Sequence, residues 1–232
     1  MRVVALDTSA RMGGVALQDG DHLLIDATVE MERKHSERLL PTLAWAMETV
    51  GWCGASVGLV AVTHGPGAFT GVRAGVTVAK TLAFGWGVDV VAFSTMDAIA
   101  HGHRHARRPL HVLFDARKQQ VYSARYTPSA GGGRLVRMGD IACCLPDEAL
   151  RDHAPDTLYV GDGSEAYRHV IEAKGGEIAD GPAGLCRPGH VAALAARHVS
   201  DAASALPEAH ALAPLYVRRP EAEVRADGAD GR

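Results

Sequence analysis

Two histidines, His101 and His105, lie four residues apart and are the pair in this chain best spaced to hold a metal. On a helix, side chains at that spacing face the same way, and imidazole is a common ligand for transition metals. However, Gly102 would loosen the helix, and the three arginines within residues 104–108 would repel a cation. Only Asp97 offers a carboxylate nearby in the sequence. We therefore predict a solvated connection between two lobes here rather than a metal site.

Hydrolytic chemistry has little support in the sequence. His35 and His64 flank predicted helices, and neither has a serine or cysteine nucleophile and an orienting acid beside it. We expect capping or core roles for both. None of the four cysteines has the Cys-x-x-Cys spacing of a metal clip or redox pair, so we expect ordinary thiols without a structural disulfide.

The composition predicts a cytoplasmic globular protein. The 232 residues are 47% hydrophobic, which suits one large domain or two small lobes. A formal charge of −3 provides no overall basic field, so we expect contact with RNA only through a more basic partner. Asp7 interrupts the N-terminal apolar run, and no apolar stretch approaches the ~20 residues of a membrane span.

The first part of the chain has the pattern of an α/β lobe, which we place at residues 1–106. Three short strands in a meander are followed by a helix, a strand, a second helix and a last strand. The later strands must be parallel because helices connect them. Thr70 is the expected cap of the second helix, after the turn Gly65-Pro66-Gly67. The expected strands are 3–6, 13–17, 22–29, 57–62 and 88–93, and the first helix runs from Ser36 to Val50.

A second lobe is expected at residues 107–220, and it also opens with strands. We predict strands at 110–115 and 121–126, a flexible loop at 129–133, and helices at 147–152, 164–174 and 190–199. The remaining residues, 221–232, are polar and small, which predicts a flexible tail.

Five motifs occur in the order typical of one protein family. They are Ala5–Ser9, His35–Pro41, Gly65–Arg73, Asp115–Lys118 with Val121-Tyr122, and Pro214–Arg218. Together they span nearly the whole chain, which thereby resembles the bacterial TsaB (YeaZ-like) family. Ala68 stands where several members have serine, a small-for-small change. The resemblance implies an actin-like, sugar-kinase (ASKHA) fold of the α/β class, with two lobes that each carry a mixed sheet flanked by helices.

The function implied by this resemblance is a non-catalytic role in tRNA modification. TsaB-like proteins belong to the machinery that forms N6-threonylcarbamoyladenosine in tRNAs reading codons that begin with A. In that family the subunit binds TsaD, the catalytic subunit, through helices of its N-terminal lobe, and the ATPase TsaE joins them. The resemblance permits a homodimer when the protein is alone. It implies tRNA contact only through the complex, no tightly bound cofactor, and room for ATP or ADP at the partner interface.

Two predicted helices carry small and apolar residues at helical spacing, and we predict that these residues form the partner interface. Some of them must instead pack on the chain's own sheet, because a helix that covers a sheet buries one face. We further expect a bulky residue at Gly75 to block association with TsaD without unfolding the protein. The predicted interface residues are Leu39, Leu43, Ala44, Met47, Gly71, Ala74, Gly75, Val78, Ala79 and Leu82.

The resemblance also suggests where catalytic groups are missing. TsaD-type enzymes hold a metal with two histidines four apart, and the equivalent positions here are near Thr95 and Ile99, which carry no imidazole. We therefore predict no catalytic residue and no metal ligand. Arg104, Arg107 and Arg108 remain a weak candidate contact for tRNA phosphate within a complex.

A nucleotide contact remains open at the end of the first strand. Asp7, Thr8 and Ser9 lie where actin-like enzymes direct an aspartate and hydroxyls toward phosphate and magnesium. The residues that follow depart from the kinase pattern, and Gly161-Asp162-Gly163 is only a generic turn signal. We favour a structural turn over an independent ATP site. The rival function is a stand-alone enzyme of the same fold, either a small-molecule kinase or a glycopeptidase.

Overall fold

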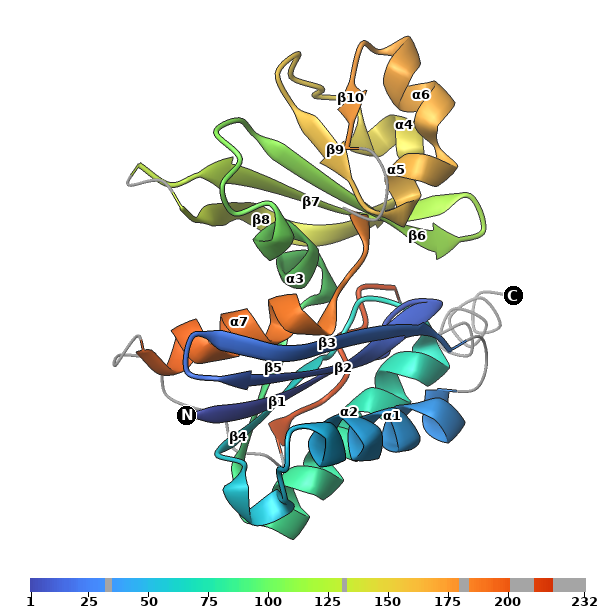
Figure 1. Ribbon diagram of the computed structural model, residues 1–232. Coiled ribbons are helices and arrows are strands. Elements are labelled where there is room, and N and C mark those ends of the chain that lie inside the picture. The colour runs from blue at the N-terminus through green and yellow to red at the C-terminus, as the bar shows by residue number, and fades with distance from the viewer. Residues whose placement is uncertain (32–34, 131–132, 180–183, 201–210, 219–232) are drawn as a thin grey trace, which may run out of the picture.

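The computed structural model describes residues 1–31, 35–130, 133–179, 184–200 and 211–218, and these form two lobes. Each lobe is built on a five-stranded sheet, and the two lobes lie one above the other in Figure 1. The predicted tail at 221–232 lies outside the described residues, as does the side chain of Ser36. No helix in the described ranges is long and apolar enough to cross a membrane.

The first sheet has the predicted meander followed by parallel strands. Its strands are β1 (Arg2–Asp7), β2 (Met12–Asp19), β3 (His22–Glu30), β4 (Leu59–Thr63) and β5 (Asp89–Phe93), in the order β3-β2-β1-β4-β5. Strands β1, β2 and β3 pair antiparallel, whereas β1, β4 and β5 pair parallel. Because β1 is central, its side chains are buried on both faces of the sheet.

The second sheet repeats this pattern. Its strands are β6 (Leu110–Arg117), β7 (Gln120–Pro128), β8 (Leu135–Cys144), β9 (Leu158–Val160) and β10 (Glu177–Ile178). The order β10-β9-β6-β7-β8 places β6 at the position of β1, with an antiparallel meander on one side and parallel strands on the other. This duplicated arrangement confirms the predicted actin-like, sugar-kinase fold of two lobes with mixed sheets.

Helices cover both faces of the first sheet. On one face α1 (His35–Thr49) and α2 (Phe69–Trp86) pack with Val4 and Leu6 in one apolar core. On the other face α3 (Thr95–Gly102) and α7 (Pro188–Ser200) pack with Val3 and Ala5 in a second core. The alternation along β1 follows from the two-residue period of a strand.

Helix α7 belongs to the first sheet in space although it comes late in the chain. It contacts β1, β2 and β3, and Figure 1 shows it in orange against the lower sheet. Residues 211–218 also return, since Leu212 joins the core of α1 and α2. The expected division of the chain at residues 106 and 107 does not anticipate this return of the segment from Pro188 onward.

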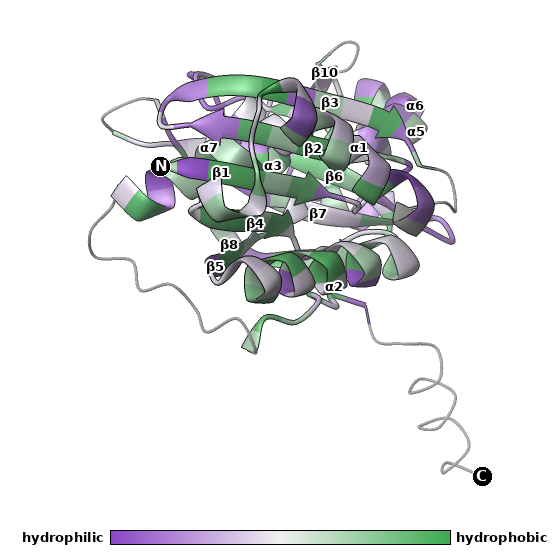
Figure 2. Cartoon of the chain, turned by 60° about the horizontal axis from the view of Figure 1, so that its bottom comes forward, coloured by the Kyte–Doolittle hydropathy of each residue, from purple (hydrophilic) through white to green (hydrophobic). Residues whose placement is uncertain are grey.

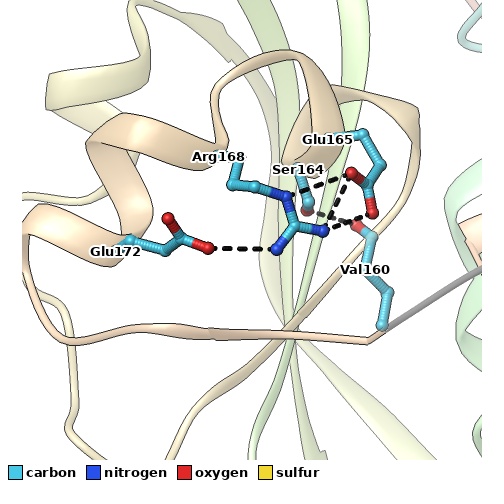
Figure 3. A network of polar contacts seen from close by, with 5 residues as sticks. All are labelled: Val160, Ser164, Glu165, Arg168 and Glu172. Carbon is cyan, nitrogen blue, oxygen red and sulfur yellow. Dashed lines mark hydrogen bonds and ion pairs between the residues drawn. The ribbon is translucent and has the colours of Figure 1, made fainter.

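The second sheet has shorter helices, α4 (Pro146–Ala149), α5 (Asp162–Ala166) and α6 (Arg168–Ala173). The single helix expected at 164–174 is wrong, because the chain breaks at Tyr167 between α5 and α6. Arg168 connects the two pieces, with ion pairs of 2.9 Å to Glu165 and 3.0 Å to Glu172, as Figure 3 shows. The Ser164 hydroxyl ties α5 to Val160 of β9 at 2.9 Å.

Candidate functional site: the cavity between the lobes and the outer face of α1 and α2

A cavity of about 460 Å³ lies between the two lobes. The first lobe contributes the turn after β1 and the start of α2, and the second contributes β6, β7 and the start of α5. The returning segment at residues 215–218 closes one side. The lining residues are Ser9, Ala10, Arg11, Gly67, Ala68, Phe69, Val72, Phe114, Asp115, Ala116, Arg117, Tyr122, Asp162, Leu215, Tyr216 and Arg218.

The predicted nucleotide contact, Asp7-Thr8-Ser9, forms a closed network of hydrogen bonds. All three residues are buried. The Asp7 Oδ1 atom accepts hydrogen bonds from the Ser9 amide, the Ser9 hydroxyl and the Thr63 hydroxyl, at 3.1, 2.7 and 2.5 Å. Thr8 donates its hydroxyl to the Gly71 carbonyl at 2.8 Å. Both hydroxyls of the motif are therefore engaged within the chain.

Burial also disfavours the charged form of Asp7. Desolvation raises the pKa of this carboxyl, and the hydrogen bonds from Thr63 and Ser9 offset part of that rise. The Asp7 Oδ2 atom is buried without a hydrogen-bond partner. A magnesium–phosphate group needs charged, accessible oxygen ligands, and this buried carboxyl does not offer them. The arrangement supports the structural turn, and a nucleotide contact at Asp7, Thr8 and Ser9 remains only a prediction.

The glycine turn after β4 is filled by the chain's own backbone. Gly65 has φ of 114°, and a side chain at Gly67 would meet the Ser9 carbonyl at 2.3 Å. The Leu215 amide donates to the His64 carbonyl at 2.7 Å, which brings the returning segment onto this turn. The turn therefore joins three segments, and Gly67 borders the cavity. The predicted Thr70 cap is wrong, because the helix starts at Phe69 with Ala68 as its N-cap.

Charged groups of the second lobe face the cavity more openly. Asp115 accepts a hydrogen bond from the Arg117 amide at 2.9 Å and forms a 3.1 Å ion pair with its guanidinium. The Asp162 carboxylate accepts from the Asp115 amide at 2.9 Å, and burial raises the pKa of Asp162. The sequence motif 161–163, taken as a generic turn, therefore builds one wall of the cavity. Its signal was an aspartate directly after a short apolar strand, as at Asp7.

Two exposed aromatic rings form the opposite wall. Phe69 and Tyr216 stack with ring centroids 5.4 Å apart, and the Arg73 guanidinium lies 5.1 Å from the centre of the Phe69 ring. Aromatic faces opposite paired charges are suited to binding a ligand. The Ser9 hydroxyl also borders the cavity, and it donates a hydrogen bond to the buried Asp7 carboxyl, whose charged form burial disfavours.

The histidine region differs from its prediction. His101 lies in α3 and is buried, with only 7% of its surface exposed, so the prediction of a solvated connection is wrong at this residue. Burial, and then the charge of Arg104, lower the pKa of His101 to about 4. Its ring lies 6.4 Å from that of His190 on α7. Sequence reasoning missed this burial because α7 arrives from far along the chain.

The positions expected to carry metal-binding histidines are buried inside the protein. Thr95 and Ile99 both lie in α3 with no exposed surface. Within the described residues, no group of three or more histidine, cysteine or acidic side chains is placed to hold a metal ion.

The ten predicted interface residues divide into two groups. Leu39, Leu43, Gly71, Gly75 and Ala79 are buried in the first lobe. The remaining five reach the surface: Ala44 is exposed, while Met47, Ala74, Val78 and Leu82 are half-buried.

Gly75 has a specific internal role. A side chain there would meet the Thr8 hydroxyl at 2.2 Å, so a bulky residue would disturb the turn after β1. Such a substitution is therefore expected to lower the free energy of unfolding, and the prediction that it also blocks association with TsaD stays a prediction.

Exposed apolar side chains lie on the outside of the same two helices. Leu40 and Trp45 of α1 are 46% and 54% exposed, and Phe84 of α2 is 91% exposed. Figure 2 shows apolar residues around much of α2. Leu40, Ala44 and Met47 follow one another at helical spacing, as do Ala74, Val78 and Leu82. This outer face of α1 and α2 is an apolar surface that the chain itself leaves partly uncovered.

Comparison with known proteins agrees with this architecture. Residues 29–226 match the family model described as TsaD: tRNA N6-adenosine threonylcarbamoyltransferase. The tRNA threonylcarbamoyladenosine biosynthesis protein TsaB of Bacillus subtilis is 30% identical over 97% of this chain and 97% of its own. The protein of the same name from Escherichia coli is 30% identical over 78% of this chain and 80% of its own.

A solved structure extends the agreement to three dimensions. YeaZ from Pseudomonas aeruginosa superposes with a TM-score of 0.76 at 25% identity, covering 93% of this chain and 99% of that one. Sequence and structure thus match along nearly the whole length, and the chain belongs to the TsaB (YeaZ) family and, with it, to the wider family that the matching model describes.

Proposed function

We propose that this protein is the non-catalytic scaffold and activator subunit that binds TsaD, with TsaE, for formation of N6-threonylcarbamoyladenosine in tRNAs reading codons that begin with A. The observation that carries the proposal is the end-to-end match to a protein named for biosynthesis of this nucleoside. A role in tRNA threonylcarbamoyladenosine biosynthesis is supported because the relatives that match this chain are named for that pathway. The scaffold role rests on the site geometry and on the partly uncovered face of α1 and α2.

The non-catalytic part of the proposal is supported by the buried groups. Near the positions where the resemblance places the histidines of TsaD-type enzymes, the chain has Thr95 and Ile99 in the core of α3. The acid at the end of β1 is enclosed by Ser9 and Thr63, and its pKa is raised. Neither region offers an exposed reactive group.

The binding surface for TsaD is proposed on the outer face of α1 and α2. Ala44, Met47, Ala74, Val78 and Leu82 are the predicted interface residues that reach the surface, and the exposed Leu40 extends them. Paired helices with small and apolar residues suit close packing against an equivalent pair. The buried members of the prediction, such as Leu39 and Gly71, would support this surface from within. The same face would serve a homodimer in the absence of TsaD.

Other contacts follow from the scaffold role. We propose that tRNA meets this subunit only through the complex, since the formal charge is −3. An ATP or ADP molecule, where present, would lie at the partner interface rather than on Asp7, Thr8 and Ser9, whose polar groups are engaged internally. A cytoplasmic location accompanies work on tRNA.

Reconstitution tests this proposal directly. Threonylcarbamoyl transfer to tRNA is measured with TsaD, TsaE and the carbamoyl-adenylate synthase, with and without this protein. We expect transfer only when it is present. Equal transfer in its absence would contradict the scaffold role. Assays for ATP hydrolysis and bound metal would then test the rival, a stand-alone kinase or glycopeptidase.

A matched pair of variants tests the surface. Ala44→Arg places a charge on the exposed part of α1, and we expect roughly tenfold weaker association with TsaD. Ala166→Arg makes the same change at an exposed position of α5 in the other lobe, and should bind normally. Circular dichroism should show both variants folded. Equal binding by the two variants would move the interface away from α1.

A further inference from the structure

A second cavity, of about 380 Å³, lies on the far side of α3 and shares no lining residue with the cavity between the lobes. Helices α3 and α7 and strands β7 and β8 form it. The cavity contains four arginines from separate parts of the chain. Arg104 follows α3, Arg134 and Arg137 lie at the start of β8, and Arg197 lies in α7.

The positive charge of this cavity is mostly unbalanced. Asp97 is the one acidic residue among the described residues that line it. Its carboxylate is already held by the Arg137 guanidinium at 3.0 and 3.1 Å and by the Tyr126 hydroxyl at 2.8 Å. One carboxylate thus compensates one arginine, and among the described residues that line the cavity no second carboxylate accompanies Arg104, Arg134 and Arg197.

Of the acidic residues in a neighbouring hollow, Asp26 is already paired. Arg104 and Arg197 also border this hollow, which contains Asp21 and Asp26. The Asp26 carboxylate is paired with Arg187 at 3.0 Å and accepts the Gly189 amide at 3.1 Å. Its charge is therefore engaged at the start of α7.

Two histidines also line the cavity. The Nε2 atom of His198 is buried without a hydrogen-bond partner in the described structure. Such an orphan atom is costly unless something bonds to it. The His101 ring is held neutral by burial and by Arg104, so it adds no further charge.

The walls of the cavity strengthen its attraction for an anion. Phe93, Leu135, Val136 and Leu194 supply apolar surface beside the guanidinium groups. The attraction between opposite charges is stronger beside apolar surface than in open water. Guanidinium groups also bind phosphate through two parallel hydrogen bonds. The volume lies within the range typical of small-molecule sites, roughly 300–1,000 Å³.

We propose that this cavity binds the phosphate groups of a small phosphorylated ligand, of the pyrophosphate or nucleotide class, with Arg104, Arg134 and Arg197 as its cationic contacts. The concave shape favours a compact phosphate group over an extended RNA backbone. The proposal is independent of the scaffold role, because neither α1 nor α2 lines the cavity.

The test is calorimetric titration of the full chain with inorganic pyrophosphate and, separately, with AMP. We expect saturable binding that Arg134→Gln and Arg197→Gln each weaken by roughly tenfold, as the loss of one charge-assisted contact predicts. Arg151→Gln removes an exposed arginine of the same lobe outside the cavity, and should bind like the unmodified chain. The melting temperatures of the three variants should agree, which separates binding from folding.

Three results would overturn the proposal. The first is no binding of pyrophosphate or AMP at millimolar concentration. The second is an equal loss in Arg151→Gln, which would indicate nonspecific charge attraction. The third combines two results: Arg134→Gln and Arg197→Gln retain less tRNA on filters than the unmodified chain, and pyrophosphate binds to none of these proteins. That outcome would assign the arginines to contact with an RNA backbone.

Discussion

The central strands of the two sheets carry aspartates near their ends in opposite environments. Asp7 of β1 is buried, and three hydrogen bonds converge on one of its oxygens. Asp115 of β6, at the equivalent position of the repeated strand order, interacts with Arg117 at the edge of the cavity. Duplication of the fold has therefore produced one turn that stabilises the first lobe and one that remains available to a ligand.

The largest expected effect comes from Asp7→Ala, measured as the free energy of unfolding in urea. The change leaves the Ser9 and Thr63 hydroxyls buried without their acceptor, and should cost about 3 kcal/mol. Asp115→Ala should cost less than about 1 kcal/mol, because its partner can turn to water.

Asp7→Asn serves as the control for this comparison. The amide keeps an acceptor oxygen and lacks the charge that burial disfavours, so it should cost less than Asp7→Ala. If Asp7→Ala and Asp115→Ala destabilise equally, the two turns do not differ as we describe.

A second effect comes from the helix that packs on the β1 turn. Gly75→Leu should lower the free energy of unfolding by about 2 kcal/mol, because its Cβ would meet the Thr8 hydroxyl at 2.2 Å. Gly85→Ala lies in the same helix with nothing within 4 Å of the new carbon, and should stabilise by about 0.5 kcal/mol. Equal effects of the two substitutions in urea unfolding would show that Gly75 is not a close contact.

The third prediction concerns how the free energy of unfolding changes with pH, and a buried residue in each lobe changes it in opposite directions. Burial lowers the pKa of His111 in β6 to about 3, so below about pH 6.5 the unfolded chain binds a proton that the folded chain excludes. The free energy of unfolding should fall by about 2 kcal/mol from this residue between pH 7 and pH 5. The raised pKa of Asp7 has the opposite effect. The folded chain holds the Asp7 proton more tightly than the unfolded chain does, so this residue lowers the free energy of unfolding as pH rises.

His111→Gln tests the histidine contribution. The amide can still bond to the Ser123 hydroxyl, which lies 2.7 Å from the histidine ring, but it does not titrate. Urea unfolding of the variant should show a weaker loss of stability between pH 7 and pH 5. An unchanged pH profile would mean that His111 is accessible to protons in the folded state.

The smallest expected effect is on the ion pairs that connect α5 and α6. Arg168 bonds Glu165 and Glu172 at the surface, where solvent screens the charges. Arg168→Gln should leave the urea midpoint within experimental error. A large shift would show that the break at Tyr167 depends on these pairs, and that the second lobe relies on surface charge more than the first.

Much of the fold was predictable from local patterns. The meander and parallel strands of the first lobe, the first two strands of the second lobe and the helices at 36–50 and 190–199 follow from hydrophobic period and turn residues, whereas β8, β9 and β10 were not predicted. The return of α7 to the first sheet was not predictable in this way. Its apolar residues recur at the spacing found in any helix that packs on a sheet, and this spacing does not indicate which of the two sheets α7 covers.

The candidate site was predictable only in part. The turns at Asp7 and at residues 65–67 were recognised because glycines and short polar residues punctuate apolar strands. The burial of His101 and the wall built by Asp162 depend on segments more than forty-five residues away. For the predicted interface residues, helical spacing indicated the two helices, but which of these residues reach the surface depends on how each helix is rotated on the sheet.

The return of α7 also bears on synthesis of the chain at the ribosome. Strands β1 to β5 emerge within the first 93 residues and α3 follows at once, yet α7, which packs with α3 on one face of their sheet, begins only at Pro188. Until then, that face lacks a cover that the folded protein supplies, and exposed apolar sheet favours association with other chains. The first lobe is therefore completed late, and until most of the chain has been translated its nascent form exposes the apolar surface that chaperones bind.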